Sequence, residues 1–118
     1  MIKRLSLLLI AVLLIAVIAD ARSSQWSRVR NAYIAEHNEC AACGRTSDLQ
    51  IHHIRPFNKF PELELDTGNL ITLCVSGCNC HLSIGHGGNF KYYNENVVED
   101  CKYFRRLVEN RLPNRGEQ

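Results

Sequence analysis

Two cysteine clusters constrain this chain more than any other feature of its sequence. The first is "CAACG", in which Cys40 and Cys43 are separated by two residues and followed by Gly44, and the second is "CVSGCNC" at residues 74–80. A chain of 118 residues builds only a small core, and small domains often depend on a metal ion or on disulfides. A C-x2-C knuckle with a following glycine presents two thiolates to one point. The pattern therefore predicts a four-cysteine Zn²⁺ site.

The same cysteines leave two questions open. Spacing favours Cys78, which forms C-x3-C with Cys74, over Cys80, which forms C-x5-C. A disulfide framework is the alternative to a metal site, as in many exported proteins. The two residues inside the first pair are tight for a structural disulfide and comfortable for a metal knuckle, so spacing favours zinc. We expect Cys101 to pack in the core as a small apolar residue.

Apolar periodicity predicts an α+β order of elements around these clusters. In chain order we expect a helix at residues 23–39, strands at 48–54 and 69–74, a short helix after Cys80 and a last helix at 96–112. Ser24 is the expected cap of the first helix. Trp26, Val29 and Tyr33 recur at helical spacing and should form its buried face.

The N-terminal segment differs from the rest of the chain. Lys3 and Arg4 precede an apolar run at residues 5–19, and "ADA" follows the run. A positive start, an apolar run of this length and an A-x-A end are typical of a signal peptide. The run is short for a membrane span, but if uncleaved it would attach the chain to the membrane with its charged end in the cytoplasm. We expect residues 1–21 to be a signal peptide or membrane anchor, and the protein to be exported (periplasmic or secreted) or anchored in the inner membrane.

Four of the five histidines lie close to the cysteine clusters. His52 and His53 end the first predicted strand in "IHHI", and His81 directly follows Cys80. A zinc site that joins the clusters would draw His81 towards that strand end. One imidazole can bind a metal ion while another accepts a proton, because the ordinary pKa of about 6.5 lies near working pH. Asn69, unless it is only a turn residue, can hold loop backbone near the base.

In this order, "CAACG", "LQIHHIRPF", "DTGNLITLC" and the "CH" at residues 80–81 resemble the zinc-containing HNH endonucleases, over about residues 38–95. The resemblance implies a ββα-metal fold, in which two strands and a helix surround one divalent ion. The fold class is then a small zinc-stabilised α+β domain at residues 22–118, with flanking helices and preceded by an N-terminal hydrophobic helix.

The resemblance also implies a role for each matching residue. His53 takes the place of the general base and Asn69 that of the middle Asn, and these two form the catalytic pair. His52 and His81 take the places of metal ligands. The proposed reaction is metal-dependent hydrolysis of phosphodiester bonds in nucleic acid, with DNA as the expected substrate. The catalytic ion would be Mg²⁺, Mn²⁺, Ni²⁺ or Zn²⁺, and no small-molecule cofactor is expected.

Two details of the ligand sets depart from simple spacing. The last cysteine of the family directly precedes the helical ligand, which implies Cys80 rather than Cys78 in the zinc site. The implied zinc ligands are therefore Cys40, Cys43, Cys74 and Cys80. His86 is a further candidate metal ligand, because relatives with histidine ligands place a second one four residues along the helix. Here the spacing from His81 is five, which is awkward on one face of an α-helix.

Nucleic-acid contacts must come from local groups, because the formal net charge is only +2. The candidates for contacts with the phosphate backbone are Arg55, Lys59 and Lys91. Phe90, Tyr92 and Tyr93 are candidates either for stacking on bases or for packing against the zinc knuckle.

Two other functions fit the same residues. A non-catalytic, zinc-stabilised nucleic-acid-binding module would tolerate replacement of His53. A disulfide-linked exported protein would hold no metal. An exported nuclease would not meet cytoplasmic DNA, so the nuclease interpretation requires incoming or environmental DNA, or an anchored enzyme.

Overall fold

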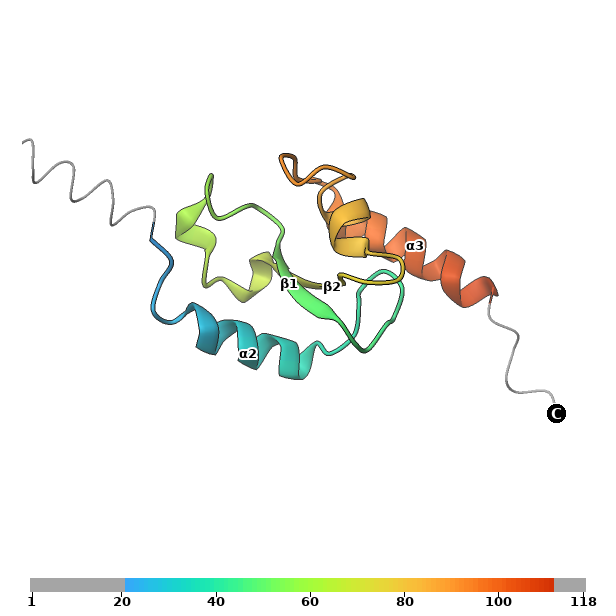
Figure 1. Ribbon diagram of the computed structural model, residues 1–118, viewed down its shortest axis with the longest axis horizontal. Coiled ribbons are helices and arrows are strands. Elements are labelled where there is room, and N and C mark those ends of the chain that lie inside the picture. Colours follow the sequence, from blue (N-terminus) through green and yellow to red (C-terminus); the bar gives the residue numbers. More distant parts are fainter. Residues whose placement is uncertain (1–20, 112–118) are drawn as a thin grey trace, which may run out of the picture.

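The computed structural model describes residues 21–111, whereas residues 1–20 and 112–118 lie outside the described part (Figure 1). The expected signal peptide or anchor, with its hydrophobic helix, falls almost entirely on residues 1–20 and stays a prediction. Within residues 21–111, no helix has the length and apolar character needed to cross a membrane.

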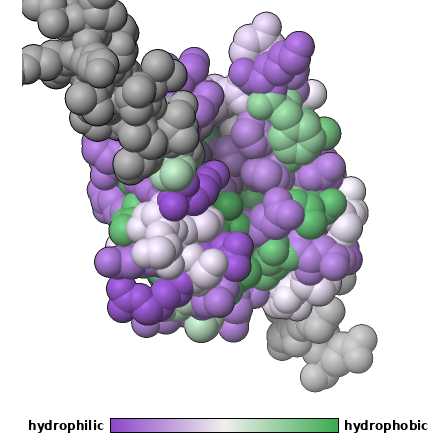
Figure 2. Space-filling view, turned by 60° about the vertical axis from the view of Figure 1, so that its left-hand side comes forward, coloured by the Kyte–Doolittle hydropathy of each residue, from purple (hydrophilic) through white to green (hydrophobic). Residues whose placement is uncertain are grey.

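Two helices flank a two-stranded sheet, with α2 and α3 on opposite sides of the strands (Figure 1). The main elements are α2 (Trp26–Glu36), β1 (Leu49–His53), β2 (Leu70–Cys74) and α3 (Val97–Arg111). Three single turns complete the order: 3₁₀ turns at Pro61–Leu63 and Thr67–Asn69 and a π-helical turn at His81–Gly85. The predicted α+β order is confirmed. The face shown in space-filling form is mostly hydrophilic, with hydrophobic side chains scattered over it (Figure 2).

The register of the sheet places the two kinds of candidate site residue at opposite ends of it. β1 and β2 are antiparallel, with Leu49 opposite Cys74 and His53 opposite Leu70. Cys74 therefore lies at one end of the hairpin, near the first cysteine cluster, and His53 lies at the other end. All five residues of β2 are buried, as expected for a strand covered on both faces.

The core is small and rich in cysteine. Leu73 and Val97 are the largest fully buried side chains, and they pack in one cluster with cysteines of both groups. Cys101 is buried in the same cluster, as predicted. So little buried apolar surface stabilises a domain weakly, which makes a metal ion among these cysteines structurally useful.

Tertiary contacts, rather than a local cap, position α2. Its N-cap residue is Gln25, whose side chain makes no capping hydrogen bond, so the prediction that Ser24 caps this helix is wrong. The backbone N–H of Ser23 instead donates to the buried Glu64 carboxylate at 2.8 Å. Tyr33 is half-buried, on the predicted inner face, and its hydroxyl donates to the Leu70 carbonyl at 2.9 Å. These bonds hold α2 against the sheet.

α3 is held over the first cysteine cluster by Arg105. One guanidinium nitrogen donates to the Cys40 carbonyl at 3.2 Å, and another lies 3.3 Å from the Glu39 carboxylate. Gly44 allows this approach, because a Cβ atom there would lie 2.7 Å from Arg105 Nη1, and its φ of +77° favours glycine. The turn of the knuckle and the last helix therefore depend on each other.

Candidate metal centres and catalytic cleft

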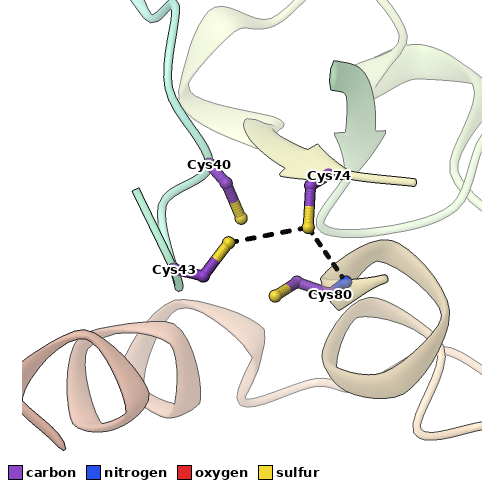
Figure 3. Close-up of side chains that lie close together, drawn as sticks. All are labelled: Cys40, Cys43, Cys74 and Cys80. Atoms are coloured by element: carbon purple, nitrogen blue, oxygen red, sulfur yellow. Dashed lines mark hydrogen bonds between the residues drawn. The ribbon is translucent and has the colours of Figure 1, made fainter. Parts of the chain in front are cut away.

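Four thiols meet where the first cysteine cluster, the end of β2 and the start of the π-helical turn come together (Figure 3). Cys40, Cys43, Cys74 and Cys80 each offer a sulfur atom, and these atoms all lie within 4.8 Å of one another. The sulfurs of Cys43 and Cys74 are 3.7 Å apart, far longer than a disulfide bond of about 2.0 Å. All six cysteines of the chain are in the described part, and none is disulfide-bonded.

Cys80 belongs to this group and Cys78 does not. The Cys78 side chain is exposed, whereas the Cys80 N–H donates to the Cys74 sulfur at 3.4 Å. Gly77 and Asn79 both adopt positive φ, at 64° and 45°. This left-handed turn shortens the path between the two thiols, so the extra residues bulge outward. The spacing argument for Cys78 fails for that reason.

Burial acts on the pKa values of three of these thiols. It raises the pKa of Cys43 to about 11, and it raises the pKa of Cys80 further. Burial also acts to raise the pKa of Cys40, but backbone N–H donors from Cys43, Cys74 and Ala42 outweigh it, so the net shift is downward. A bound cation reverses this preference by stabilising thiolates. The four thiols at this separation fit Zn²⁺, whose structural sites are tetrahedral and sulfur-rich.

Three histidine rings form a second group of potential metal ligands. One ring nitrogen from each of His52, His81 and His86 lies within 4.8 Å of the others, and the ring centroids are 4.9–5.1 Å apart in edge-on arrangements. His52 is only 4% exposed. Its Nε2 atom is buried and has no hydrogen-bond partner among the described residues. An unpaired buried nitrogen is costly, and coordination to a metal ion would satisfy it.

The tautomer of His86 suits this role. Its Nδ1 atom lies 2.7 Å from the Tyr92 carbonyl oxygen. A carbonyl only accepts hydrogen bonds, so Nδ1 must carry the proton and the neutral ring keeps a lone pair on Nε2. Histidines that bind metals commonly donate their second nitrogen to a carbonyl in this way.

The π-helical turn resolves the awkward spacing of His81 and His86. The His86 N–H donates to the His81 carbonyl at 3.1 Å, an i to i+5 bond, so residues five apart share one face of the turn. Gly85 makes room for the third ring. A Cβ atom at Gly85 would lie 3.0 Å from Leu73 Cδ1 and 3.2 Å from His52 Cε1.

The electrostatics of this group keep the rings of His52 and His81 neutral. Burial lowers the pKa of His52 to about 3, and nearby histidine charges add to the effect. Burial, followed by the charge of His86, also lowers the pKa of His81. Neutral imidazole is the form that binds a metal ion. A donor set of three imidazole nitrogens fits a divalent transition metal ion.

His53, the candidate base, is held beside this group with a neutral ring. Its Nε2 atom lies 3.0 Å from the Glu64 carbonyl oxygen, so Nε2 carries the proton and Nδ1 remains free to accept one. Burial lowers the pKa of His53 most, the hydrogen bond to Glu64 opposes that shift, and the Arg22 charge lowers the pKa further. The ring also packs against Trp26.

The four histidines line one cleft of about 470 Å³. Two of the predicted nucleic-acid contacts, Lys59 and Lys91, line the same cleft. Arg55 does not: its side chain is exposed and its guanidinium lies 5.3 Å from the centre of the Phe60 ring. The structure thus brings together the candidate base, the candidate ligands and two of three candidate phosphate contacts.

Asn69 acts on the backbone behind the base. It lies in the 3₁₀ turn before β2 rather than in the strand, and it is 6% exposed. Its Oδ1 atom accepts from the Arg55 N–H at 2.9 Å, and its Nδ2 atom donates to the Arg55 carbonyl at 3.0 Å. Because Arg55 is two residues beyond His53, these bonds fix the end of β1. Asn69 does not line the cleft, so it is a candidate positioning residue rather than a candidate catalytic one.

Three contributors to the site escaped the sequence analysis: Arg22, Trp26 and Glu64. The Arg22 guanidinium lies 4.3 Å from the Phe57 ring centre and lines the cleft. Glu64 contacts both His53 and Ser23. These contacts join residues far apart in the chain, so no local pattern signals them. The only hint is the alternation of two glutamates with leucines in "PELEL", where Glu64 is the second glutamate.

The comparison with protein families agrees with this geometry. Residues 40–87 match the family profile described as HNH endonuclease. The matched segment contains both cysteine groups, the four clustered histidines and Asn69. Neither the curated proteins nor the solved structures yield a match. The resemblance inferred from the sequence is confirmed over residues 40–87, which match the HNH endonuclease family model.

Proposed function

We propose that the protein is a metal-dependent endonuclease that hydrolyses phosphodiester bonds in nucleic acid, with DNA as its substrate. One observation carries the proposal. Three imidazoles with their ligand atoms within 4.8 Å of one another share a cleft with His53, whose Nδ1 atom is free to accept a proton. A divalent ion site beside a neutral base is what hydrolysis of a phosphodiester requires.

In this mechanism, His53 Nδ1 takes a proton from the water molecule that attacks phosphorus. The bond from phosphorus to the departing 3′ oxygen breaks, and that oxygen takes a proton from solvent. The Glu64 carbonyl, which accepts from Nε2, stabilises the positive charge that His53 gains. A divalent ion held by His52, His81 and His86 would supply positive charge to the phosphate and the leaving oxygen.

The ligand set bears on the choice of that ion. Imidazole suits Zn²⁺ and Ni²⁺, whereas Mg²⁺ prefers carboxylate, carbonyl and water oxygens. Within residues 21–111, no carboxylate joins the three histidines, which favours Zn²⁺ or Ni²⁺ over Mg²⁺. The four cysteines would hold a separate structural Zn²⁺.

Substrate binding would draw on the cations at the cleft. Lys59 and Lys91 line it and would contact phosphates of the bound strand. Arg55, outside the cleft, would contact more distant backbone. We also propose that residues 1–21 direct export or attach the protein to the inner membrane, so that its substrate is DNA outside the cytoplasm.

A plasmid-nicking assay with the full chain tests the proposal. Each preparation is assayed with Mg²⁺, Mn²⁺, Ni²⁺ or Zn²⁺, beside the variants His53→Ala and His37→Ala. His37 is exposed and outside the histidine cleft, which makes it a matched control. We expect metal-dependent nicking by the native chain and His37→Ala, and a loss of roughly 100- to 10,000-fold in His53→Ala, with circular dichroism and zinc content unchanged.

Each other outcome points elsewhere. Nicking that survives His53→Ala removes the assigned base. Binding of DNA without nicking under any metal supports the non-catalytic module. A folded, metal-free protein with oxidised thiols supports the disulfide-linked alternative.

A further inference from the structure

Two large aromatic side chains are exposed at the mouth of the histidine cleft. Phe90 is 63% exposed and Tyr92 is 68% exposed, and both line the cleft. We refer to these two residues as the aromatic lip. Two exposed rings at the edge of a candidate nucleic-acid site form a patch of the kind that marks a binding surface.

The aromatic lip is held by a hydrogen-bonded frame. The Tyr92 carbonyl accepts from His86 Nδ1 at 2.7 Å, and the Tyr92 N–H donates to the Asn89 carbonyl at 2.9 Å. The Asn89 side chain accepts from the Lys91 N–H at 2.9 Å, and the Asn94 N–H donates to the Gly85 carbonyl at 3.0 Å. These bonds fix the backbone of the lip to the π-helical turn, so the rings are presented to solvent by an ordered segment.

The aromatic lip is continuous with the candidate metal ligands. The Phe90 ring centroid lies 5.0 Å from that of His86 and 5.9 Å from that of His81. Cations lie in the same cleft: Lys91 is between the two lip residues, and Lys59 Nζ is 5.2 Å from the Tyr93 ring centre. Rings beside cations are the combination that binds single-stranded nucleic acid, because bases stack on the rings and phosphates pair with the cations.

We propose that the aromatic lip is a stacking platform for unpaired bases, and that the cleft therefore takes single-stranded nucleic acid in preference to continuous duplex. In a duplex each base is stacked on its neighbours and presents only its edges in the grooves. Its face is available to a protein ring only after unpairing, which costs free energy. The inference rests on the proposed function, since it names the substrate class of the same cleft.

The test measures binding with the full-length His53→Ala protein, so that no chemistry intervenes. Fluorescence anisotropy follows three probes at one fixed salt concentration: a short fluorescein-labelled DNA strand, the same strand in a duplex, and a strand of abasic sites. We expect the ordinary strand to bind most tightly. The abasic strand keeps the phosphates and lacks the bases, and it should bind roughly 5- to 150-fold more weakly.

Substitutions in the aromatic lip assign the effect to its rings. Tyr92→Ala should weaken strand binding by roughly 5- to 150-fold and leave abasic binding unchanged, whereas Tyr92→Phe keeps the ring and should bind like the parent. Tyr103 is a matched control, since it is 59% exposed on α3 and does not line the cleft. Tyr103→Ala should bind normally. A 2-aminopurine base in the strand should lose emission on binding the parent and regain it with Tyr92→Ala.

Three results would overturn the inference: duplex bound as tightly as the single strand, an abasic strand bound as tightly as the ordinary one, or equal effects of Tyr92→Ala and Tyr103→Ala. The proposed function fails differently, through absence of metal-dependent cleavage by the native chain on any substrate. If duplex is cleaved at the same rate with and without the aromatic lip, the proposed nuclease activity holds and only this inference is wrong.

Discussion

The indole ring of Trp26 lies on the imidazole of His53, with centroids 4.5 Å apart and ring planes inclined by 30°. Trp26 is the first residue of α2 and His53 is the last residue of β1. The start of the helix thus packs on the candidate base, while the Glu64 carbonyl holds its Nε2 atom. Together they fix the rotation of the ring.

We therefore expect Trp26→Leu to lower kcat by roughly 10- to 100-fold with little change in KM, because a misplaced base slows proton transfer more than it weakens binding. Trp26→Phe keeps an aromatic face and should retain most of the activity. Steady-state kinetics on a labelled DNA strand, beside urea unfolding, would check this. Equal losses in both variants would show that the contact does not position the base.

Asn69→Ala should lower the free energy of unfolding by roughly 1–3 kcal/mol, because it leaves the Arg55 N–H and carbonyl without their side-chain partners. Asn69→Asp keeps the acceptor for the Arg55 N–H, so its free energy of unfolding should lie between those of the native chain and Asn69→Ala. Urea denaturation measures both. The exposed Asn31 is a control, and Asn31→Ala should stay within about 0.5 kcal/mol of the native chain. An unchanged free energy of unfolding in Asn69→Ala would contradict the assigned role.

Cys80→Ser should release the structural zinc, because Cys80 is one of the four clustered cysteines. Cys78→Ser should not, because Cys78 is exposed and lies outside that cluster. Metal analysis should give about one tightly held zinc per chain in Cys78→Ser. Zinc binding contributes about 10–16 kcal/mol in isolated zinc fingers, so Cys80→Ser should also melt at a much lower temperature. Identical zinc content in the two variants would refute the ligand set.

Gly85→Ala should weaken the histidine site for metal ions by roughly 10- to 100-fold, the range seen when the support of a ligand is disturbed. The added Cβ atom would meet Leu73 and His52 at 3.0–3.2 Å and displace the His52 ring. Calorimetric titration with Ni²⁺, on protein whose cysteine site is already filled with zinc, reports the affinity. Ser83→Ala changes an exposed side chain on the same turn and serves as the control.

Local patterns in the sequence were sufficient to predict most of the fold. The strands and the last helix agree with their predicted limits to within one or two residues, because alternation and helical periodicity are set by neighbouring side chains. The placement of His81 near His52 required one further assumption, that both cysteine clusters serve one ion. The rings of these two histidines do lie together.

The failures occurred where backbone conformation or distant contacts decide the outcome. Gly77 and Asn79 adopt left-handed backbone conformations that bring Cys80 back to the other three clustered cysteines. The spacing of cysteines in the sequence does not reveal such a turn. α2 starts without a side-chain cap, and Glu64, remote in sequence, instead accepts from Ser23 just before the helix. The contact between Trp26 and His53 likewise exists only in the folded chain.

The i to i+5 turn that carries His81 and His86 affects how related chains should be sought. A search motif that requires its last two ligands to be three or four positions apart would miss this protein. A sequence alignment without a one-residue insertion between His81 and His86 would not align His86 with the second helical ligand of related chains. A search for His-x4-His with glycine immediately before the second histidine keeps the pair and the small residue that gives the third ring its space.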